Sequence, residues 1–312
     1  SLKERLPVIL TKIIDYISRE SLIHYISKLK NDLVTNKAYD LLTVDTPEAK
    51  KWNEWISNAE NSYYFTNAWL FSECYVYRRL REGLQNFDVF GAQKSEALQN
   101  AMESMCLVSE KVLAMMPESP KEKKKADFIT LLKVMIVYCT TYDILRVQMK
   151  FKSYIVCDNA GYELFADLCL GSFLISQGVV QKVRYHLKNI PWFVSDVTPE
   201  TEEQLCVSCD DFWTSPHPYK DMKKYDPNLY RKLQFAIAVC FKGDLNYRKL
   251  LADKNWPPYA GFESCLQGFI PAPVIALRTV KADLICALPK GKLDQMRKAV
   301  TDIIYEIYRI HR

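Results

Sequence analysis

Three segments of the sequence place acidic or amide side chains after short apolar runs. Asp158 and Asn159 follow the first run, Asp196 follows the second, and residues 243–247 follow the third. Carboxylate and amide oxygens are hard ligands, and two acids with one amide suit Mg²⁺ or Mn²⁺ with coordination positions left for water and substrate. These residue types therefore predict a divalent-metal site.

A fourth segment supplies positive charge. Arg278 and Lys281 follow another apolar run, and Arg248 is the residue next to the 243–247 segment. Lysine and arginine beside a metal suit a phosphate group, and backbone amides at a helix N-terminus, here around Gly243, add donors for an anion. The combination favours metal-assisted phosphate hydrolysis. Each acid taken singly is more often an N-cap or turn residue than a catalytic one, so the prediction depends on the four segments lying together.

The elements predicted around these segments would bring them together. The predicted strands cover 153–158, 180–187, 235–241 and 274–278, and the predicted helices between them cover 161–175, 227–234 and 245–251. Strands that alternate with helices predict a mainly parallel sheet covered on both faces, which is a three-layer α/β/α domain. Ligands bind beyond the carboxyl ends of such strands, so the four segments would face one crevice.

The first half of the chain is predicted to be helical. After Pro7, apolar residues recur at Leu10, Ile13, Ile14 and Ile17, which is the spacing of one buried helical face. Further helices are predicted over 68–84, 95–115 and 126–150. We therefore expect an all-helical N-terminal domain over residues 1–150 and the α/β/α domain over residues 151–312.

Side chains of the helix predicted at 68–84 could approach the crevice from the helical domain. The candidates are Glu73, Arg78 and Arg79, although an inter-domain salt bridge or a solvated helix face is the favoured interpretation. The aromatic residues of this helix are expected in the hydrophobic core: Trp69, Tyr75 and Tyr77.

The composition excludes several classes of partner. The 312 residues carry 42 Lys and Arg against 37 Asp and Glu, a net charge of +5 without a concentrated basic stripe, so we expect no nucleic-acid partner. No run approaches the ~20 apolar residues that span a bilayer, so we expect no membrane partner. The N-terminal residues show no signal sequence. We expect a monomer in the cytoplasm, with the nucleus as the alternative location.

The ten cysteines are scattered along the chain and indicate reduced, mostly buried thiols rather than a disulfide framework. Cys206 and Cys209 form one CxxC motif, and the second pair that a zinc site requires is missing.

Six motifs resemble one known family. Four lie in the second half of the chain: Cys157-Asp-Asn-Ala-Gly-Tyr-Glu163, Pro191-Trp-Phe-Val-Ser-Asp196, Phe241-Lys-Gly-Asp-Leu-Asn-Tyr-Arg-Lys249 and Leu277-Arg-Thr-Val-Lys-Ala-Asp283. Two lie in the first half: Trp69-Leu-Phe-Ser-Glu-Cys-Tyr-Val-Tyr-Arg-Arg79 and Phe87-Asp-Val-Phe90. Together they resemble the metal-dependent damage-control phosphatases, and most of all the subgroup with an Arg-Thr-x-Lys motif that is also named acidic residue methyltransferase. The resemblance spans almost the whole chain.

The resemblance implies a divalent metal, Mn²⁺, Ni²⁺, Co²⁺ or Mg²⁺, with Asp158, Asn159 and Asp196 as its ligands. It also implies hydrolysis of sugar phosphates of the fructose 1-phosphate or fructose 6-phosphate type, a metabolite damage-control activity. The residues that would hold this substrate are Gly243, Asp244, Leu245, Asn246, Tyr247, Arg278 and Lys281. The connection at 198–219 looks shorter than the family's usual one, which bears on the substrate that is accepted.

The predicted catalytic residues are Asp158, Asp196 and Asp244. The attacking group is either water or Asp158 itself. Asp244 is the candidate acid for the leaving sugar oxygen, and capping of the helix that follows it is an equally weighted alternative. Lys281 and Arg278 would neutralise the charge that develops during transfer.

Two other classes compete with the phosphatase. The alternative implied by the subgroup's other name is an S-adenosylmethionine-dependent protein-glutamate (carboxyl) O-methyltransferase, which could coexist with hydrolysis. A nucleoside-type cofactor normally needs a glycine-rich first turn, whereas residues 158–161 contain one glycine and begin with an acid that suits a metal better. The other class, a catalytically silent binding module, is disfavoured by the intact set of acids, amide and lysine.

Overall fold

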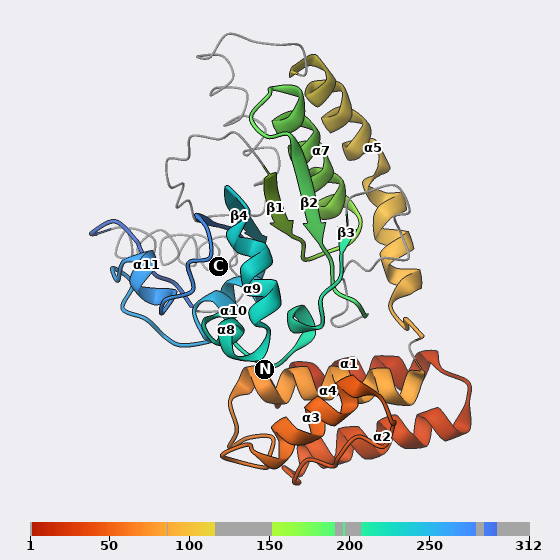
Figure 1. Ribbon diagram of the computed structural model, residues 1–312. Coiled ribbons are helices and arrows are strands. Elements are labelled where there is room, and N and C mark those ends of the chain that lie inside the picture. Colours follow the sequence, from red (N-terminus) through yellow and green to blue (C-terminus); the bar gives the residue numbers. More distant parts are fainter. Residues whose placement is uncertain are drawn as a thin grey trace, which may run out of the picture.

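A five-stranded sheet forms the centre of the second half of the chain (Figure 1). The computed structural model describes residues 2–85, 87–115, 152–190, 196, 207–278 and 284–291. The strands are β1 (Lys152–Val156), β2 (Lys182–His186), β3 (Val207–Ser208), β4 (Ala238–Lys242) and β5 (Val274–Leu277). They lie in the order β3-β2-β1-β4-β5, and every neighbouring pair is parallel. The predicted parallel sheet is confirmed, and β3 adds an edge strand that is too short to show a periodic pattern.

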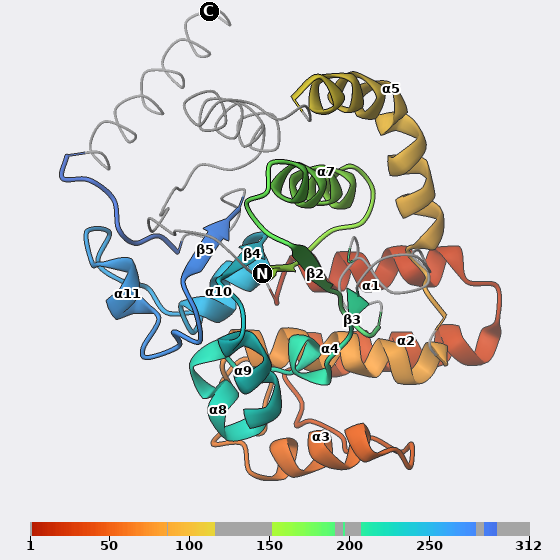
Figure 2. The same ribbon diagram turned by 45° about the horizontal axis from the view of Figure 1, so that its top comes forward.

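Helices cover both faces of this sheet (Figure 2). The helices of this part are α7 (Tyr162–Ser176), α8 (Met222–Tyr225), α9 (Pro227–Gln234), α10 (Asp244–Leu250) and α11 (Phe262–Cys265), with the 3₁₀ turns η2 (Asp211–Thr214) and η3 (Tyr219–Asp221). Successive residues of β1 face opposite ways, so Ile155 packs in the core under α7 while Tyr154 and Val156 pack in the core under α9 and α10. The expected three-layer α/β/α architecture is confirmed.

The helical N-terminal region has a core of its own. Its helices are α1 (Arg5–Tyr16), α2 (Glu20–Val34), α3 (Pro47–Ser57) and α4 (Trp69–Leu84). Leu10, Trp52 and Tyr75 lie in this core and are almost completely buried, as the helical spacing predicted for α1 and the core position predicted for Tyr75 require. Figure 1 shows the four helices side by side at one end of the sheet domain.

Helix α5 (Gly91–Met115) leaves the helical region and runs along α7 (Figure 1). Its Val108 and Val112 belong to the same hydrophobic core as Ile155 of β1, so α5 is part of the outer layer on that face of the sheet. The helix predicted at 126–150 and the domain boundary predicted at residue 150 lie outside the described residues, and the boundary stays a prediction.

Local signals in the sequence correctly predicted the start of α9 and the end of α7. Asp226 caps α9 by accepting a hydrogen bond from the amide of Leu229 at 2.9 Å, and Pro227 occupies the first turn. Gly178 follows α7 with φ +63°, a left-handed conformation that glycine adopts without strain. The elements η2, η3, α8 and α11 were not predicted because three or four residues are too few to show a helical period.

Among the described cysteines, Cys106 and Cys209 are exposed free thiols and the others are buried free thiols, in agreement with the prediction. Cys206 lies outside the described residues, and with it the geometry of the CxxC motif. None of the helices described in residues 2–115, 152–190 and 207–291 is long and apolar enough to cross a membrane.

The contact between α7 and β2 yields a test of this packing. A Cβ atom added at Gly171 would lie 2.0 Å from the Tyr185 hydroxyl oxygen, so Gly171→Ala should lower the free energy of unfolding by about 1–3 kcal/mol through overpacking. Tyr185→Phe removes that oxygen and should recover part of the loss. Urea denaturation of the wild type, both single variants and the double variant measures the coupling; strictly additive effects would contradict the proposed contact.

Candidate active site

Asp158 and Asp196, the two acids predicted as metal ligands, are brought together at the carboxyl edge of the sheet. Asp158 follows β1, and a short antiparallel bridge joins its neighbour Asn159 to Asp196. Both carboxylates contact one cation, because Lys188 Nζ lies 3.0 Å from Asp158 Oδ1 and 2.8 Å from Asp196 Oδ1. The prediction that separate loops converge on one place is therefore met for these two segments.

Lys188 is a site residue that the sequence analysis missed. It stands two residues after the end of β2, as Asp158 stands two residues after the end of β1, and Val156 and His186 are partners in the parallel register. Burial would lower the pKa of Lys188, but the carboxylates of Asp196 and Asp158 outweigh it and raise that pKa above its usual value. The equal offset after two adjacent strands was the signal that could have identified it.

The chemistry of these side chains fits a hard divalent cation. Two carboxylates already converge on one positive charge, and the side-chain nitrogen of Asn159 donates to Glu163 Oε2 at 2.8 Å, so its oxygen is the atom that would serve a metal. Within the described part of the chain, no three His, Cys, Asp or Glu side chains form a metal-binding group. Two acids and an amide would be the donor set for such an ion, and they would leave the remaining positions to water and substrate.

Gly243 brings the third segment against the first. It follows β4 with φ +85°, and its amide donates to the carbonyl of Leu277 at 2.8 Å. A Cβ atom at this position would lie 1.8 Å from Asp158 Oδ2. Only glycine permits both this backbone conformation and this approach, so the start of α10 lies directly beside the carboxylate.

The side chains of Leu245 and Asn246 attach this loop to the interior of the protein. Leu245 packs into the core of the helical region. The Asn246 side chain is buried, donates to the carbonyl of Lys242 at 2.7 Å and accepts a hydrogen bond from the Tyr219 hydroxyl. Both residues were predicted to bind substrate, and in this arrangement their side chains bind the protein while the backbone of the loop stays beside Asp158.

Arg278 joins the fourth segment to the third. Its side chain is fully buried, and Nη1 contacts Asp244 Oδ1 at 2.7 Å. The guanidinium also lies 3.9 Å from the centre of the Tyr247 ring and donates to the carbonyl of Leu284. Asp244 and Arg278 were predicted as acid and substrate ligand, and they form an ion pair with each other. Lys281 lies outside the described residues.

A salt bridge connects α10 to the helical region. Arg248 Nη1 lies 2.8 Å from Glu73 Oε2, and Arg248 Nε lies 2.8 Å from Asp253 Oδ1. This confirms the favoured interpretation of Glu73 as an inter-domain partner. The prediction that Trp69 lies in the core is wrong: its side chain is 44% exposed at the start of α4, and its ring lies over the Arg248 guanidinium.

Arg78 and Arg79 stay within the helical region. Arg78 Nε lies 3.2 Å from Glu48 Oε1, and Arg79 Nε lies 3.3 Å from Glu82 Oε2. Each therefore has a carboxylate partner from its own region of the chain, and we assign neither arginine to the candidate site.

Lys249 is buried without a carboxylate contact among the described residues. Its Nζ donates to the backbone carbonyls of Phe212, Trp213 and Ser215 at 3.0–3.3 Å. Burial lowers the pKa of Lys249 to about 8. The ammonium ties α10 to the segment around η2, next to the loop that begins at Gly243.

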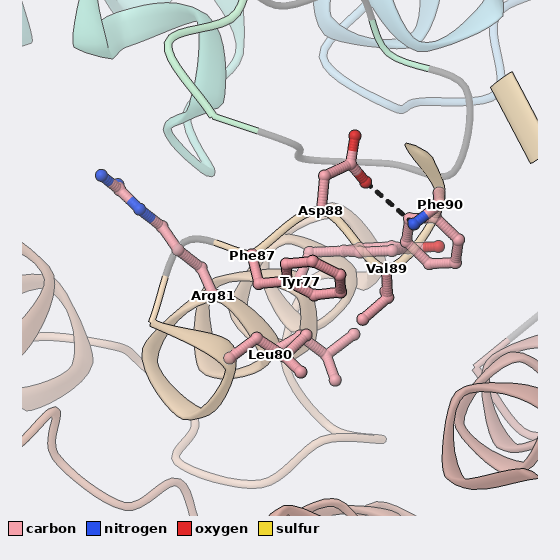
Figure 3. A pocket seen from close by; sticks show the side chains of 8 residues that line it. Tyr77, Leu80, Arg81, Phe87, Asp88, Val89 and Phe90 are labelled. Carbon is pink, nitrogen blue, oxygen red and sulfur yellow. Dashed lines mark hydrogen bonds between the residues drawn. The ribbon is translucent and has the colours of Figure 1, made fainter. Parts of the chain in front are cut away.

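A hollow beside α4 lies among residues outside this set (Figure 3). It is lined by Tyr77, Leu80, Arg81, Leu84, Phe87, Asp88, Val89 and Phe90. The Asp88 carboxylate accepts from the Phe90 amide at 2.9 Å and contacts Lys94 Nζ at 2.7 Å, so this motif shapes the entry to α5. The hollow contains none of the predicted site residues, and the candidate site stays at the sheet edge.

Comparison with known proteins identifies the family. The family model of the damage-control phosphatase ARMT1-like domain matches residues 1–137 and 145–296. The chain belongs to this family. Membership in the damage-control phosphatase family makes it a phosphatase and confirms the predicted enzyme class, and it gives no support to the methyltransferase alternative.

Three relatives named damage-control phosphatase ARMT1 illustrate the similarity. The protein of Mus musculus is 30% identical over 399 residues, which cover 95% of this chain and 91% of the relative. Those of Danio rerio and Homo sapiens are 29% and 27% identical over 400 residues, with the same coverage of this chain and 89% and 91% of the relatives. The alignments are longer than the 312 residues here, so the relatives contain segments without a counterpart in this chain.

Among solved structures, a DUF89 family protein from Pyrococcus horikoshii covers 89% of this chain and 96% of its own, with 12% identity and a TM-score of 0.43.

The buried Lys249 predicts a pH dependence of stability in this damage-control phosphatase. Its pKa falls from 10.5 to about 8 on folding, so between these values the unfolded chain binds more protons and stability rises with pH. In the wild type, the free energy of unfolding should rise between pH 8 and pH 9.5, and Lys249→Met should make this rise smaller by about 1–2 kcal/mol. Urea denaturation at both pH values measures it, with exposed Lys254→Met as the control; the same slope in Lys249→Met and wild type would contradict the assignment.

Gly243 and Gly268 form a matched pair for a test of the loop. Both have φ +85°, but a Cβ atom clashes with Asp158 only at position 243 and meets nothing within 4 Å at position 268. Gly243→Ala should displace Asp158 and reduce phosphatase activity about 100-fold, whereas Gly268→Ala should show backbone strain alone and keep its activity. Phosphate release and thermal unfolding of both variants separate the two effects, and equal activities would count against the contact.

Proposed function

We propose that the chain is a divalent-metal-dependent phosphatase that acts on small sugar phosphates of the fructose 1-phosphate and fructose 6-phosphate type. The observation that carries the proposal is the convergence of Asp158 and Asp196 on one cation, with the Gly243 loop against Asp158. Family membership supports the phosphatase part. The metal and the sugar phosphate are our proposal, based on hard oxygen donors beside a loop and cations that suit a phosphate.

In this proposal Asp158, Asn159 and Asp196 hold the ion, either Mn²⁺, Ni²⁺, Co²⁺ or Mg²⁺. The bound ion would supply positive charge that polarises the phosphoryl group. Lys188 offsets part of the negative charge of the two carboxylates and keeps them in position for this role.

The substrate would lie against the backbone of residues 243–247, with Lys281 binding its phosphate. Arg278 acts through its ion pair with Asp244, which fixes the first turn of α10. The nucleophile is either a water molecule or the Asp158 carboxylate. Asp244 is the candidate acid for the sugar oxygen, and because its carboxylate is paired with Arg278, proton transfer from it would require this ion pair to open.

One experiment tests the proposal. Purified protein is incubated with a panel of sugar phosphates, with Mn²⁺ or with chelator, and inorganic phosphate is measured beside methyl transfer from labelled S-adenosylmethionine. We expect phosphate release that chelator abolishes and that Asp158→Ala reduces by at least about 100-fold, since removal of a metal ligand displaces the reacting groups. Asp45→Ala, at an exposed acid of the helical region, is the control.

The proposal fails if Asp158→Ala retains full metal-dependent activity. Methyl transfer without phosphate release would favour the alternative class, and the absence of both reactions would favour a binding module.

A further inference from the structure

We propose that Glu163, held by Lys242, is a positioning residue that orients the side-chain amide of Asn159 so that its oxygen faces the metal. The inference rests on the proposed function, because it assumes that Asn159 is a metal ligand. It adds a role for two residues outside the predicted ligand and substrate sets.

The contact itself fixes the orientation of the amide. Asn159 Nδ2 donates to Glu163 Oε2 at 2.8 Å, and Glu163 lies in the first turn of α7, four residues further along the chain. A carboxylate can only accept hydrogen bonds, whereas an amide has a donating nitrogen at one end and an accepting oxygen at the other. If the amide turned over, two acceptors would face each other. Glu163 therefore selects the rotamer in which the oxygen is the free end.

Glu163 is in turn contacted by a lysine of the sheet. Lys242, the last residue of β4, has a side chain that is 6% exposed, and its Nζ lies 3.7 Å from Glu163 Oε1 and 2.8 Å from Asp167 Oδ1. Asp167 is completely buried one turn further along α7. A buried ammonium that faces two carboxylates of one helix fixes the position of that helix and its first-turn acid.

Glu163 and Lys242 would thus affect metal affinity without contacting the metal themselves. Residues that hydrogen-bond the far atom of a ligand orient it, and their replacement typically lowers metal affinity about 10–100-fold. Glu163 touches Asn159 and Lys242, so it acts through the ligand.

The test measures Mn²⁺ binding by isothermal titration calorimetry, without substrate. The titrations are made at about pH 8, far above the ordinary pKa of a glutamate side chain. Glu163→Gln should weaken Mn²⁺ binding by about 10-fold or more, because glutamine can pair with either end of the Asn159 amide: its oxygen accepts from Nδ2, and its nitrogen donates to Oδ1. Glu263→Gln, the same change in the first turn of α11, is the control and should bind as wild type.

A second pair of variants separates orientation from loss of charge. In Asn159→Asp both side-chain oxygens are equivalent, so nothing remains to be oriented. Glu163→Gln should then cause no weakening when it is added to Asn159→Asp. If Glu163 contributed only negative charge or fold stability, the same fold-loss would appear in the wild-type and Asn159→Asp backgrounds.

Equal losses in the two backgrounds, or no loss in the wild-type background, overturn the inference and leave the proposed function standing. Mn²⁺ binding by the wild type without phosphate release would overturn the proposed function alone, whereas a wild type that binds no Mn²⁺ overturns both. Urea unfolding in chelator verifies that each variant is folded before titration.

Discussion

The ammonium of Lys188 between Asp158 and Asp196 is the interaction on which the site depends. Two carboxylates from separate loops repel each other, and burial makes that repulsion more costly. A single buried cation within 3.0 Å of both removes this cost and sets their separation. The parallel register of β1 and β2 places Lys188 at the same level as Asp158, so the pairing of the two strands positions the positive charge beside the carboxylate.

At the start of α10, the backbone lies beside Asp158 and the side chains attach the segment to the rest of the protein. The first residue of this segment approaches Asp158 because it has no side chain, whereas Asn246, Arg248 and Lys249 face inward and bind carbonyls or acids of the protein. These buried polar side-chain contacts, together with the hydrogen bond from the Gly243 amide to the Leu277 carbonyl, hold the loop in one position. Such rigidity is what a preorganised anion site requires.

The layers of the sheet domain are predictable from the sequence, because the apolar runs of β1, β4 and β5 are buried on both faces and the helices between them have clear starts. Parallel topology then correctly placed Asp158, Asp196 and Gly243 at one edge. Lys188 was missed because a single lysine in a loop has no pattern of its own. The direction of a side chain is decided by tertiary packing, so Asn246 and the exposed Trp69 could not be assigned from spacing.

The shared core between α4 and α10 has a consequence for biosynthesis. Ile190 and Leu245 belong to the hydrophobic cluster of the helical region, and the buried Glu73 has its partner at Arg248. A ribosome releases the helices first and these partners more than a hundred residues later. Until then, the face of α4 that carries Glu73 is without these partners. The helical region is thus made before the sheet domain, and its core is completed only when Ile190 and α10 have followed.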